Sequence, residues 1–343
     1  MGVMHPPDRA EPRDRAGPAT AARPPVTGTL LGGGRHGWLD PEVLGAVGTV
    51  VSAHLGRRWR AEVFEDLGDL ASHPCGVLRG AGLSVFAKLS TDPTGPAMFD
   101  AEVRGLALLA RLAGVATPTA IGGGVVQVPG GVLFVVEALD GRRGHDRGVE
   151  DWRSIGTTLA AVHAVPGERF GLGAFDGFYG PLPQDNRLTD GGTWAEFYAE
   201  RRLRPRLRDA VDAGHLPPTL ASGVERVLRR LDGLCGPEPV PTLLHGDAQQ
   251  NNFVTGDTGA AIVDAAPYFG HPEMDLALVD YFEPAPEALF DAYRERRPID
   301  AGFAGRRHLW RLHAYLAGVA VCGDSIDGRV FLARLGAALD TYR

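Results

Sequence analysis

The residues best suited to carry chemistry lie in one short stretch that contains His245, Asp247 and Asn252, and Asp264 follows at the end of the next apolar run. A carboxylate at Asp247 can orient an acceptor hydroxyl and take its proton as a bond to phosphorus forms. Asn252 and Asp264 offer the hard oxygen atoms that Mg²⁺ prefers when it bridges nucleotide phosphates. His245 would fix the loop. This spacing predicts phosphoryl transfer in the manner of protein-kinase-like enzymes.

A plainer interpretation of the same stretch is a Gly246-Asp247 turn between two buried strands, with Asn252 and Asp264 only capping nearby backbone. Lysine usage bears on the choice. Of the 35 basic residues only Lys88 is a lysine, and the rest are arginine. A lysine kept in such a background indicates a place that needs a compact ammonium rather than a guanidinium fork, although chance retention is the alternative.

The elements around Lys88 are those that would position a nucleotide. Lys88 lies in a predicted strand, 84–89, and Glu102 lies in the first turns of a predicted helix, 98–112. A strand lysine paired with a helix glutamate would hold the α- and β-phosphates. The alternative is a surface lysine and a solvated glutamate. A later apolar strand, 132–139, runs into a turn and predicts a hinge, where Glu137 and Leu139 would meet the adenine.

The rest of the chain follows a shift from strand-like to helical patterns. Further strands are expected at 59–64 and 75–78, and the apolar run that contains the Lys88 strand covers 83–89. Helices are expected at 43–55, 152–165, 193–213, 220–234, 286–296, 304–315 and 330–342. Turn regions around Gly68-Asp69 and at 80–82 are candidates to cover the phosphates. The predicted fold class is α+β and two-lobed: a disordered tail (1–36), a small antiparallel β-rich N-lobe (37–139) and a larger, mainly helical C-lobe (140–343).

Composition narrows the classes of partner. The 343 residues are 44% hydrophobic and 22% charged, as in ordinary soluble globular proteins. A net charge of −7 leaves no basic footprint for nucleic acid, and no apolar run approaches the roughly 18 residues of a membrane span. Three isolated cysteines without metal spacing, and an N-terminus without an apolar signal region, favour a cytoplasmic protein. The oligomeric state, monomer or dimer, stays open.

Several ordered segments carry a more specific likeness. They are 85–88 (VFAK), 98–102 (MFDAE), 159–163 (LAAVH), 180–186 (GPLPQDN), 194–203 (WAEFYAERRL) and 264–277 (DAAPYFGHPEMDLA). The chain resembles the fructosamine kinase family, a branch of the aminoglycoside-phosphotransferase-like kinases, from about residue 64 to about residue 323. The resemblance implies ATP and Mg²⁺ as cofactors, Asp275 as a buried brace for the catalytic loop, and Gln249, Gln184 and Asn186 on the substrate side.

The departures from the family pattern fall near the expected acceptor. The family loop HGDLWSGN is HGDAQQNN here, so Gln249 replaces a tryptophan that lies by the sugar. In the family's LLxHxNxFG segment, Gly318 replaces the histidine and Ala320 the asparagine. An aromatic face is a good platform for a sugar ring, and a glutamine is not. The resemblance therefore implies the family's phosphoryl-transfer chemistry for this chain, whereas its specificity for ketosamines is open.

Three functions are compatible with these residues. The first is an ATP-dependent kinase that phosphorylates a hydroxyl of a small sugar-containing acceptor, a fructosamine or other ketosamine, in deglycation. The second is a phosphotransferase that inactivates an antibiotic or other natural product, such as an aminoglycoside or nucleoside antibiotic. The third is a non-catalytic pseudokinase, which would be expected to lack Asp247, Asn252, Asp264 or Lys88, all of which are present. The sequence does not distinguish ATP from GTP or identify the hydroxyl that is phosphorylated.

Overall fold

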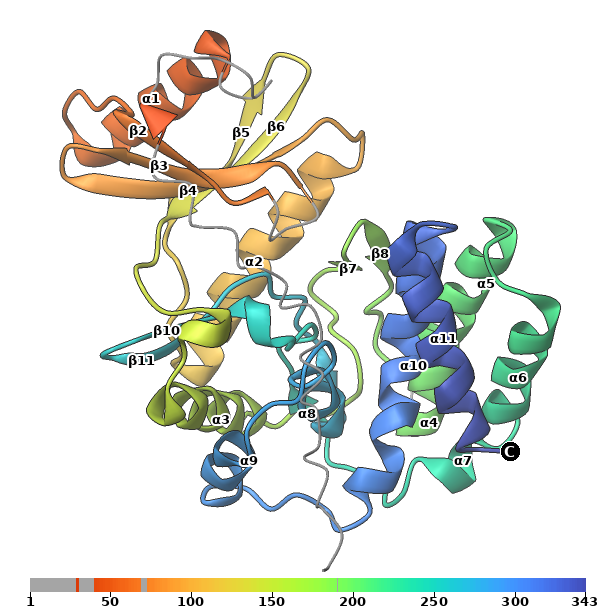
Figure 1. Ribbon diagram of the computed structural model, residues 1–343. Helices are drawn as coiled ribbons and strands as arrows, with labels where there is room; N and C mark the ends of the chain where they lie inside the picture. Colours follow the sequence, from red (N-terminus) through yellow and green to blue (C-terminus); the bar gives the residue numbers. More distant parts are fainter. Residues whose placement is uncertain (1–28, 31–39, 69–72, 190) are drawn as a thin grey trace, which may run out of the picture.

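The computed structural model describes residues 29–30, 40–68, 73–189 and 191–343. They form a small lobe built on an antiparallel sheet and a larger lobe that is mainly helical (Figure 1). The predicted α+β, two-lobed architecture is therefore confirmed. Among these residues, no helix is both long enough and apolar enough to cross a membrane.

The small lobe is a twisted sheet between two helices. In the part of the chain that is described, six strands pair in the order β1-β2-β3-β4-β6-β5, all antiparallel. The strands are β1 (Thr29–Leu30), β2 (Val63–Asp66), β3 (Cys75–Gly80), β4 (Leu83–Ser90), β5 (Ala120–Val128) and β6 (Gly131–Glu137), and the helices are α1 (Pro41–Leu55) and α2 (Gly95–Ala113).

Strand alternation explains which side chains of this sheet face the nucleotide side. Leu133 and Val135 of β6 pack into the core that α1 shares, whereas Phe134 packs on the side of α2. On β4, Ala87 belongs to the α1 core, so the next residue must point the other way. Lys88 accordingly lies beside Phe134, with its Nζ 5.0 Å from the ring centre. The period of the strand thus aims the lysine toward α2.

The larger lobe surrounds short strand pairs with helices. The hairpins are β7 (Gly177–Tyr179) with β8 (Leu182–Gln184) and β10 (Phe253–Gly256) with β11 (Gly259–Ile262), and β9 (Thr242–Leu243) pairs with β12 (Phe269–Gly270). The helices are α3 (Val149–His163), α4 (Trp194–Tyr198), α5 (Arg204–Asp212), α6 (Pro218–Leu228), α7 (Leu231–Leu234), α8 (Glu273–Leu278), α9 (Glu287–Arg294), α10 (Phe303–Cys322) and α11 (Ile326–Asp340).

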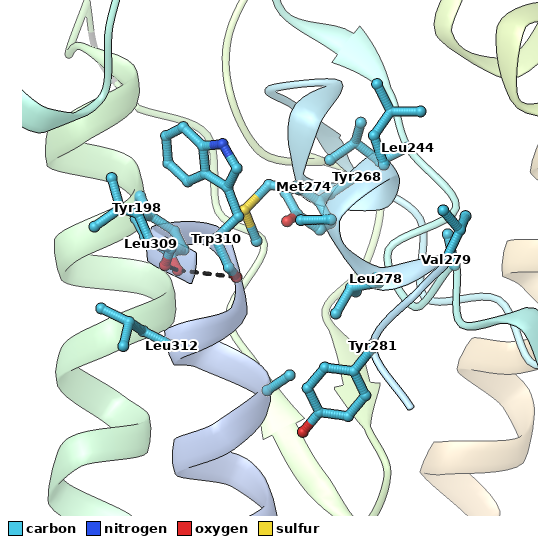
Figure 2. Close-up of a cluster of buried hydrophobic side chains, with 14 of the residues drawn as sticks. Tyr198, Leu244, Tyr268, Met274, Leu278, Val279, Tyr281, Leu309, Trp310 and Leu312 are labelled. Atoms are coloured by element: carbon cyan, nitrogen blue, oxygen red, sulfur yellow. Dashed lines mark hydrogen bonds between the residues drawn. The ribbon is translucent and has the colours of Figure 1, made fainter. Parts of the chain in front are cut away.

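An aromatic cluster anchors α10 to the segment that carries the predicted brace (Figure 2). Trp310 is fully buried, and its indole nitrogen donates to Glu273 Oε2 at 2.7 Å. The Tyr198 hydroxyl donates to the Leu309 carbonyl at 2.8 Å, so the buried phenol keeps a partner. Met274 and Leu278 of α8 lie in the same cluster. This packing fixes α8 against α10.

Three local expectations differ from the structure. Thr29–Leu30, placed in a disordered tail, pair with β2, and the other residues of 1–36 lie outside the described ranges. The strand expected from Trp59 begins only at Val63, because the Trp59 backbone N–H donates to the Ser52 hydroxyl of α1. Strand β5 was missed because three glycines at 122–124 interrupt its apolar pattern; all three have positive φ, and the pairing shifts register there.

Candidate active site

The catalytic loop is held from below by a buried carboxylate. Asp275, at 0% exposure, accepts the backbone N–H of His245 at 2.6 Å and that of Gly246 at 3.0 Å. It also contacts His163 Nε2 at 3.1 Å, and His163 Nδ1 lies 2.9 Å from the Tyr293 hydroxyl. A buried carboxylate is stable only when its oxygens are satisfied in this way. These contacts fit the bracing role expected for Asp275.

The loop turns sharply at Gly246, and only glycine fits there. Its φ of +86° lies in the left-handed region, and a Cβ would sit 1.9 Å from the Ala266 carbonyl oxygen. His245 is fully buried, burial lowers its pKa, and its Nδ1 accepts the Asp247 backbone N–H at 3.2 Å. A neutral imidazole thus fixes the backbone of the loop, which is the structural role expected for His245.

Asp247 is the base predicted for this loop. Its Oδ2 accepts from Gln249 Nε2 and from Asn252 Nδ2, both at 3.1 Å, while Oδ1 has no hydrogen-bond partner among the described residues. Burial raises the pKa of Asp247 to about 7, against the effect of those hydrogen bonds, and the Asp264 carboxylate adds to the rise. A carboxylate with a pKa near neutrality and one unpaired oxygen is suited to accept a proton from a hydroxyl.

Asp264 stands after β11 in a strained backbone conformation. Its φ is +53°, the only positive value found for a residue other than glycine in the described chain. Such a conformation costs of order 1–3 kcal/mol and persists where the surroundings hold it in place. The Lys88 ammonium contacts its Oδ1. Burial alone would raise the pKa of Asp264, but Lys88, together with Glu102 and Arg143, lowers it overall.

Lys88 joins the two lobes at this point. Its Nζ also donates to both oxygens of Glu102, at 2.8 and 2.9 Å. Burial would lower the pKa of Lys88, but the carboxylates of Asp264 and Glu102 outweigh it, so the pKa is raised and the ammonium stays charged. The strand lysine and helix glutamate are therefore brought together as the pattern predicted, within reach of the loop carboxylates.

A narrow cavity of about 40 Å³ lies behind this triad, at the hinge between the lobes. Glu137 and Leu139 line it together with the apolar side chains of Phe86 and Val263. Arg143 also lines it, and burial lowers the pKa of this guanidinium. The cavity is too small to hold an adenine ring as it stands, so the hinge would have to open for the predicted adenine contacts to form. The predicted adenine residues are thus next to Lys88 and Asp264.

A cavity of about 720 Å³, called the acceptor cavity below, extends from Lys88 and Glu102 past Asp247 and Asp264 to α10 and α11. Gln249 lines it, but Gln184 and Asn186 do not. Asn186 is fully buried and accepts from Arg202 Nη2 at 2.7 Å, and Gln184 is 3% exposed in β8. The structure therefore places these two amides among buried residues of the C-lobe, outside the lining of this cavity.

Of the two turns predicted to cover the phosphates, the one around Gly68-Asp69 runs into residues 69–72, which lie outside the described ranges. His73, the next described residue, lines the acceptor cavity together with Lys88. The other candidate, the turn at 80–82, joins β3 to β4 at the end remote from Lys88, where Arg57 donates to the Ala81 carbonyl. That candidate is wrong, because antiparallel pairing places the turn at the opposite end of β3 and β4 from Lys88.

Three further residues of the site were not predicted from the sequence. Tyr179 of β7 lines the acceptor cavity, and its hydroxyl lies close enough to Asp247 for each group to shift the pKa of the other. Tyr179 directly precedes the family-like segment 180–186, and this position in the sequence could have identified it as a site residue. His163 ends the family-like segment 159–163, to which no role was given. Arg143 had no local signal, because it reaches the hinge cavity from the chain beyond it.

The donor set fits Mg²⁺. Asn252 gives its amide N–H groups to Asp247, at 2.8 Å to the carbonyl and 3.1 Å to Oδ2, so its amide oxygen is left for a cation. Asp264 adds an ionised carboxylate whose pKa is lowered. The described residues contain no group of three or more His, Cys, Asp or Glu side chains that could hold a metal. Two protein oxygens suit an ion that takes its remaining ligands from phosphates and water.

Comparison with known proteins identifies a family of kinases. The fructosamine kinase family model matches residues 44–328. A Synechocystis protein named as a probable ketoamine kinase is 34% identical over 224 residues, which cover 64% of this chain and 71% of that protein. The ketosamine-3-kinase of Mus musculus is 30% identical over 264 residues, which cover 68% and 81% of the two chains.

Solved structures agree in fold. A Thermobifida fusca structure that carries the name fructosamine-3-kinase superposes with a TM-score of 0.71 at 33% identity and covers 86% of this chain and 99% of that one. The aminoglycoside phosphotransferase APH(4)-Ia, at 16% identity and a TM-score of 0.59, covers 86% and 99% and shares the fold. With its catalytic loop, lysine–glutamate pair and hinge arranged as described, this chain belongs to the fructosamine kinase family.

Proposed function

We propose that this protein is an ATP-dependent kinase that phosphorylates a hydroxyl of a ketosamine, the rearranged adduct of a sugar and an amine. The observation that carries the proposal is the position of Asp247, whose pKa is raised to about 7, in one cavity of about 720 Å³ that Lys88 and Asp264 also line. The names of the relatives, ketoamine and ketosamine kinases, support the acceptor class. Its need for ATP and its free cysteines suit a cytoplasmic location.

In the proposed reaction, Lys88 binds the ATP phosphates while Glu102 holds its ammonium in place. Asn252 and Asp264 would hold Mg²⁺, which when bound neutralises charge that develops on the phosphates. Asp247 orients the acceptor hydroxyl and takes its proton. The acceptor oxygen forms a bond to the γ-phosphorus as the bond from that phosphorus to the β-phosphate oxygen breaks, and ADP leaves.

The alternative acceptor is an antibiotic. It is favoured by the loss of the family's acceptor-side aromatic and imidazole at Gln249 and Gly318, both of which line the cavity. APH(4)-Ia supports the fold alone at 16% identity. The relatives named for ketoamines are about twice as similar in sequence, so the ketosamine is the better-supported acceptor. A pseudokinase would not need the complete set of Asp247, Asn252, Asp264 and Lys88.

A mass-spectrometric screen tests the proposal. Purified protein and Mg-ATP are incubated with fructosyl-lysine, ribulosyl-lysine, aminoglycosides and nucleoside antibiotics, with Asp247→Asn in parallel. We expect a phosphoryl adduct, heavier by one HPO₃ group (~80 Da), on the ketosamines alone and none with Asp247→Asn, because the base contributes in the transition state. An adduct on an antibiotic alone would overturn the acceptor class, and no adduct with any compound would overturn the ketosamine proposal.

A further inference from the structure

One face of α11 forms a wall of the acceptor cavity. Asp327, Val330, Phe331 and Arg334 all line it, at positions i, i+3, i+4 and i+7 of the helix. This spacing places the four side chains on one face. The wall therefore has a carboxylate at one end, an apolar centre and, with its Cα about 10 Å further along the helix axis, an arginine.

The apolar centre of this wall is packed against α10 and the chain after α8. Phe331 lies over Gly318, where a Cβ would sit 2.4 Å from its ring, so a larger residue at 318 would have to displace the phenyl group. The Phe331 ring stacks with Tyr281 at 6.2 Å and 18°, and Tyr281 contacts Phe282 edge-on at 4.7 Å. The aromatic rings of Phe331 and Tyr281 therefore occupy the space next to Gly318 that a larger side chain at position 318 would need.

Arg334 is held in place without a carboxylate partner. Its Nη1 donates to the Tyr281 carbonyl at 2.9 Å and Nη2 makes a longer contact of 3.4 Å to the Phe282 carbonyl. The guanidinium lies 5.7 Å from the centre of the Tyr281 ring. Within the described ranges, no Asp or Glu forms an ion pair with it. A guanidinium has five N–H donors, so most of them remain for a ligand.

Other arginines of the same lobe show the contrast. Arg306 pairs with Glu273 at 2.6 Å, and Arg307 pairs with Asp280 at 2.7 Å. Those side chains complete structural ion pairs. Arg334 lines the acceptor cavity instead, where its partners among the described residues are two carbonyl oxygens and the Tyr281 ring. An arginine in that setting is suited to a planar anion, because its fork matches a carboxylate in a bidentate manner.

We infer that Arg334 binds a carboxylate of the acceptor, so that this enzyme selects ketosamines of free amino acids. The inference rests on the proposed function. With the sugar hydroxyl at Asp247, the amino-acid part of the adduct extends along the aromatic surface of Phe331 and Tyr281 toward Arg334. A polycationic aminoglycoside would instead place ammonium groups near the guanidinium, where like charges repel. A glycated lysine inside a protein chain lacks the carboxylate.

The test compares two acceptors that differ in one group. Initial rates are measured with wild-type enzyme and saturating Mg-ATP, with fructosyl-lysine and with fructosyl-cadaverine, its analogue without the carboxylate. We expect KM to be about 10- to 100-fold higher for fructosyl-cadaverine, the range for losing a hydrogen-bonded ion. Equal KM values with normal turnover would overturn the inference and leave the ketosamine kinase intact. Turnover of neither compound would remove the proposed function, and this inference with it.

Variants locate the effect. Arg334→Gln should bring the two KM values to within about threefold of each other, and Arg334→Lys should restore part of the difference, because an ammonium keeps the charge but loses the fork. Arg329→Gln is the matched control: Arg329 is exposed on the same helix and donates to the Asp324 carbonyl, outside the cavity. An equal loss of discrimination in Arg329→Gln would contradict the assignment. Melting temperatures check folding, and the wild-type comparison stands if Arg334→Gln does not fold.

Discussion

Replacing Asp247 by asparagine removes a charge from the site with little change in packing. In the wild-type protein Oδ2 accepts from both Gln249 and Asn252, while Oδ1 has no partner in the described chain. The oxygen of an asparagine can keep both hydrogen bonds and turn its nitrogen toward the cavity. Asp247→Asn therefore isolates the cost of holding an ionised carboxylate at this position.

The size and sign of that cost follow from the pKa of Asp247. The pKa is about 7 in the folded protein against an ordinary value of 3.8, so the folded state holds the proton more tightly than the unfolded state. The contribution of Asp247 to wild-type stability should therefore fall as pH rises from about 4 to about 7, and level off above that. The difference corresponds to about 4 kcal/mol at most. Because the side chain is partly exposed, we expect Asp247→Asn to be about 2–4 kcal/mol more stable at pH 8.

The assay is urea unfolding of wild type and Asp247→Asn between pH 4 and pH 8.5, without nucleotide or magnesium. The two proteins should have similar stability near pH 4 and diverge up to pH 7, while kcat of the variant falls about 10²- to 10⁴-fold. Asp212→Asn, at an exposed position on α5, is the control and should show no such divergence. Equal stability of wild type and Asp247→Asn at pH 8 would refute the raised pKa, and retained turnover would refute the role of the base.

Two further variants test the parts that hold the nucleotide and the loop. Lys88→Arg should lower kcat/KM for ATP by at least about 100-fold, because a guanidinium fork does not fit where the 7%-exposed ammonium meets Glu102 and Asp264. If the variant kept more than about half of wild-type activity, the site between these carboxylates would accept a guanidinium. Asp275→Asn should lower the free energy of unfolding in urea by about 3–5 kcal/mol, because one amide cannot accept both loop N–H groups and also contact His163. An unchanged unfolding midpoint would contradict the bracing role of Asp275.

Local chemistry was predictable from the sequence because it depends on near neighbours. His245, Asp247 and Asn252 fall within eight residues of one another, so the loop places them together wherever it lies. The direction of Lys88 follows from the two-residue period of its strand, and the lobes follow from the change of hydrophobic period. The family resemblance added Asp275, 30 residues from the His245 backbone that it supports.

What only the tertiary structure decided is which distant side chains share a cavity. Lys88 meets Asp264 across 176 positions of the chain, and this ion pair exists only once the lobes meet. Gln184 and Asn186 stand in a segment that suggested substrate contacts, yet packing turns them inward toward the C-lobe core. The acceptor wall of Phe331 and Arg334 has no local signature. Sequence patterns report the face of an element, whereas the surface against which that face packs depends on contacts far along the chain.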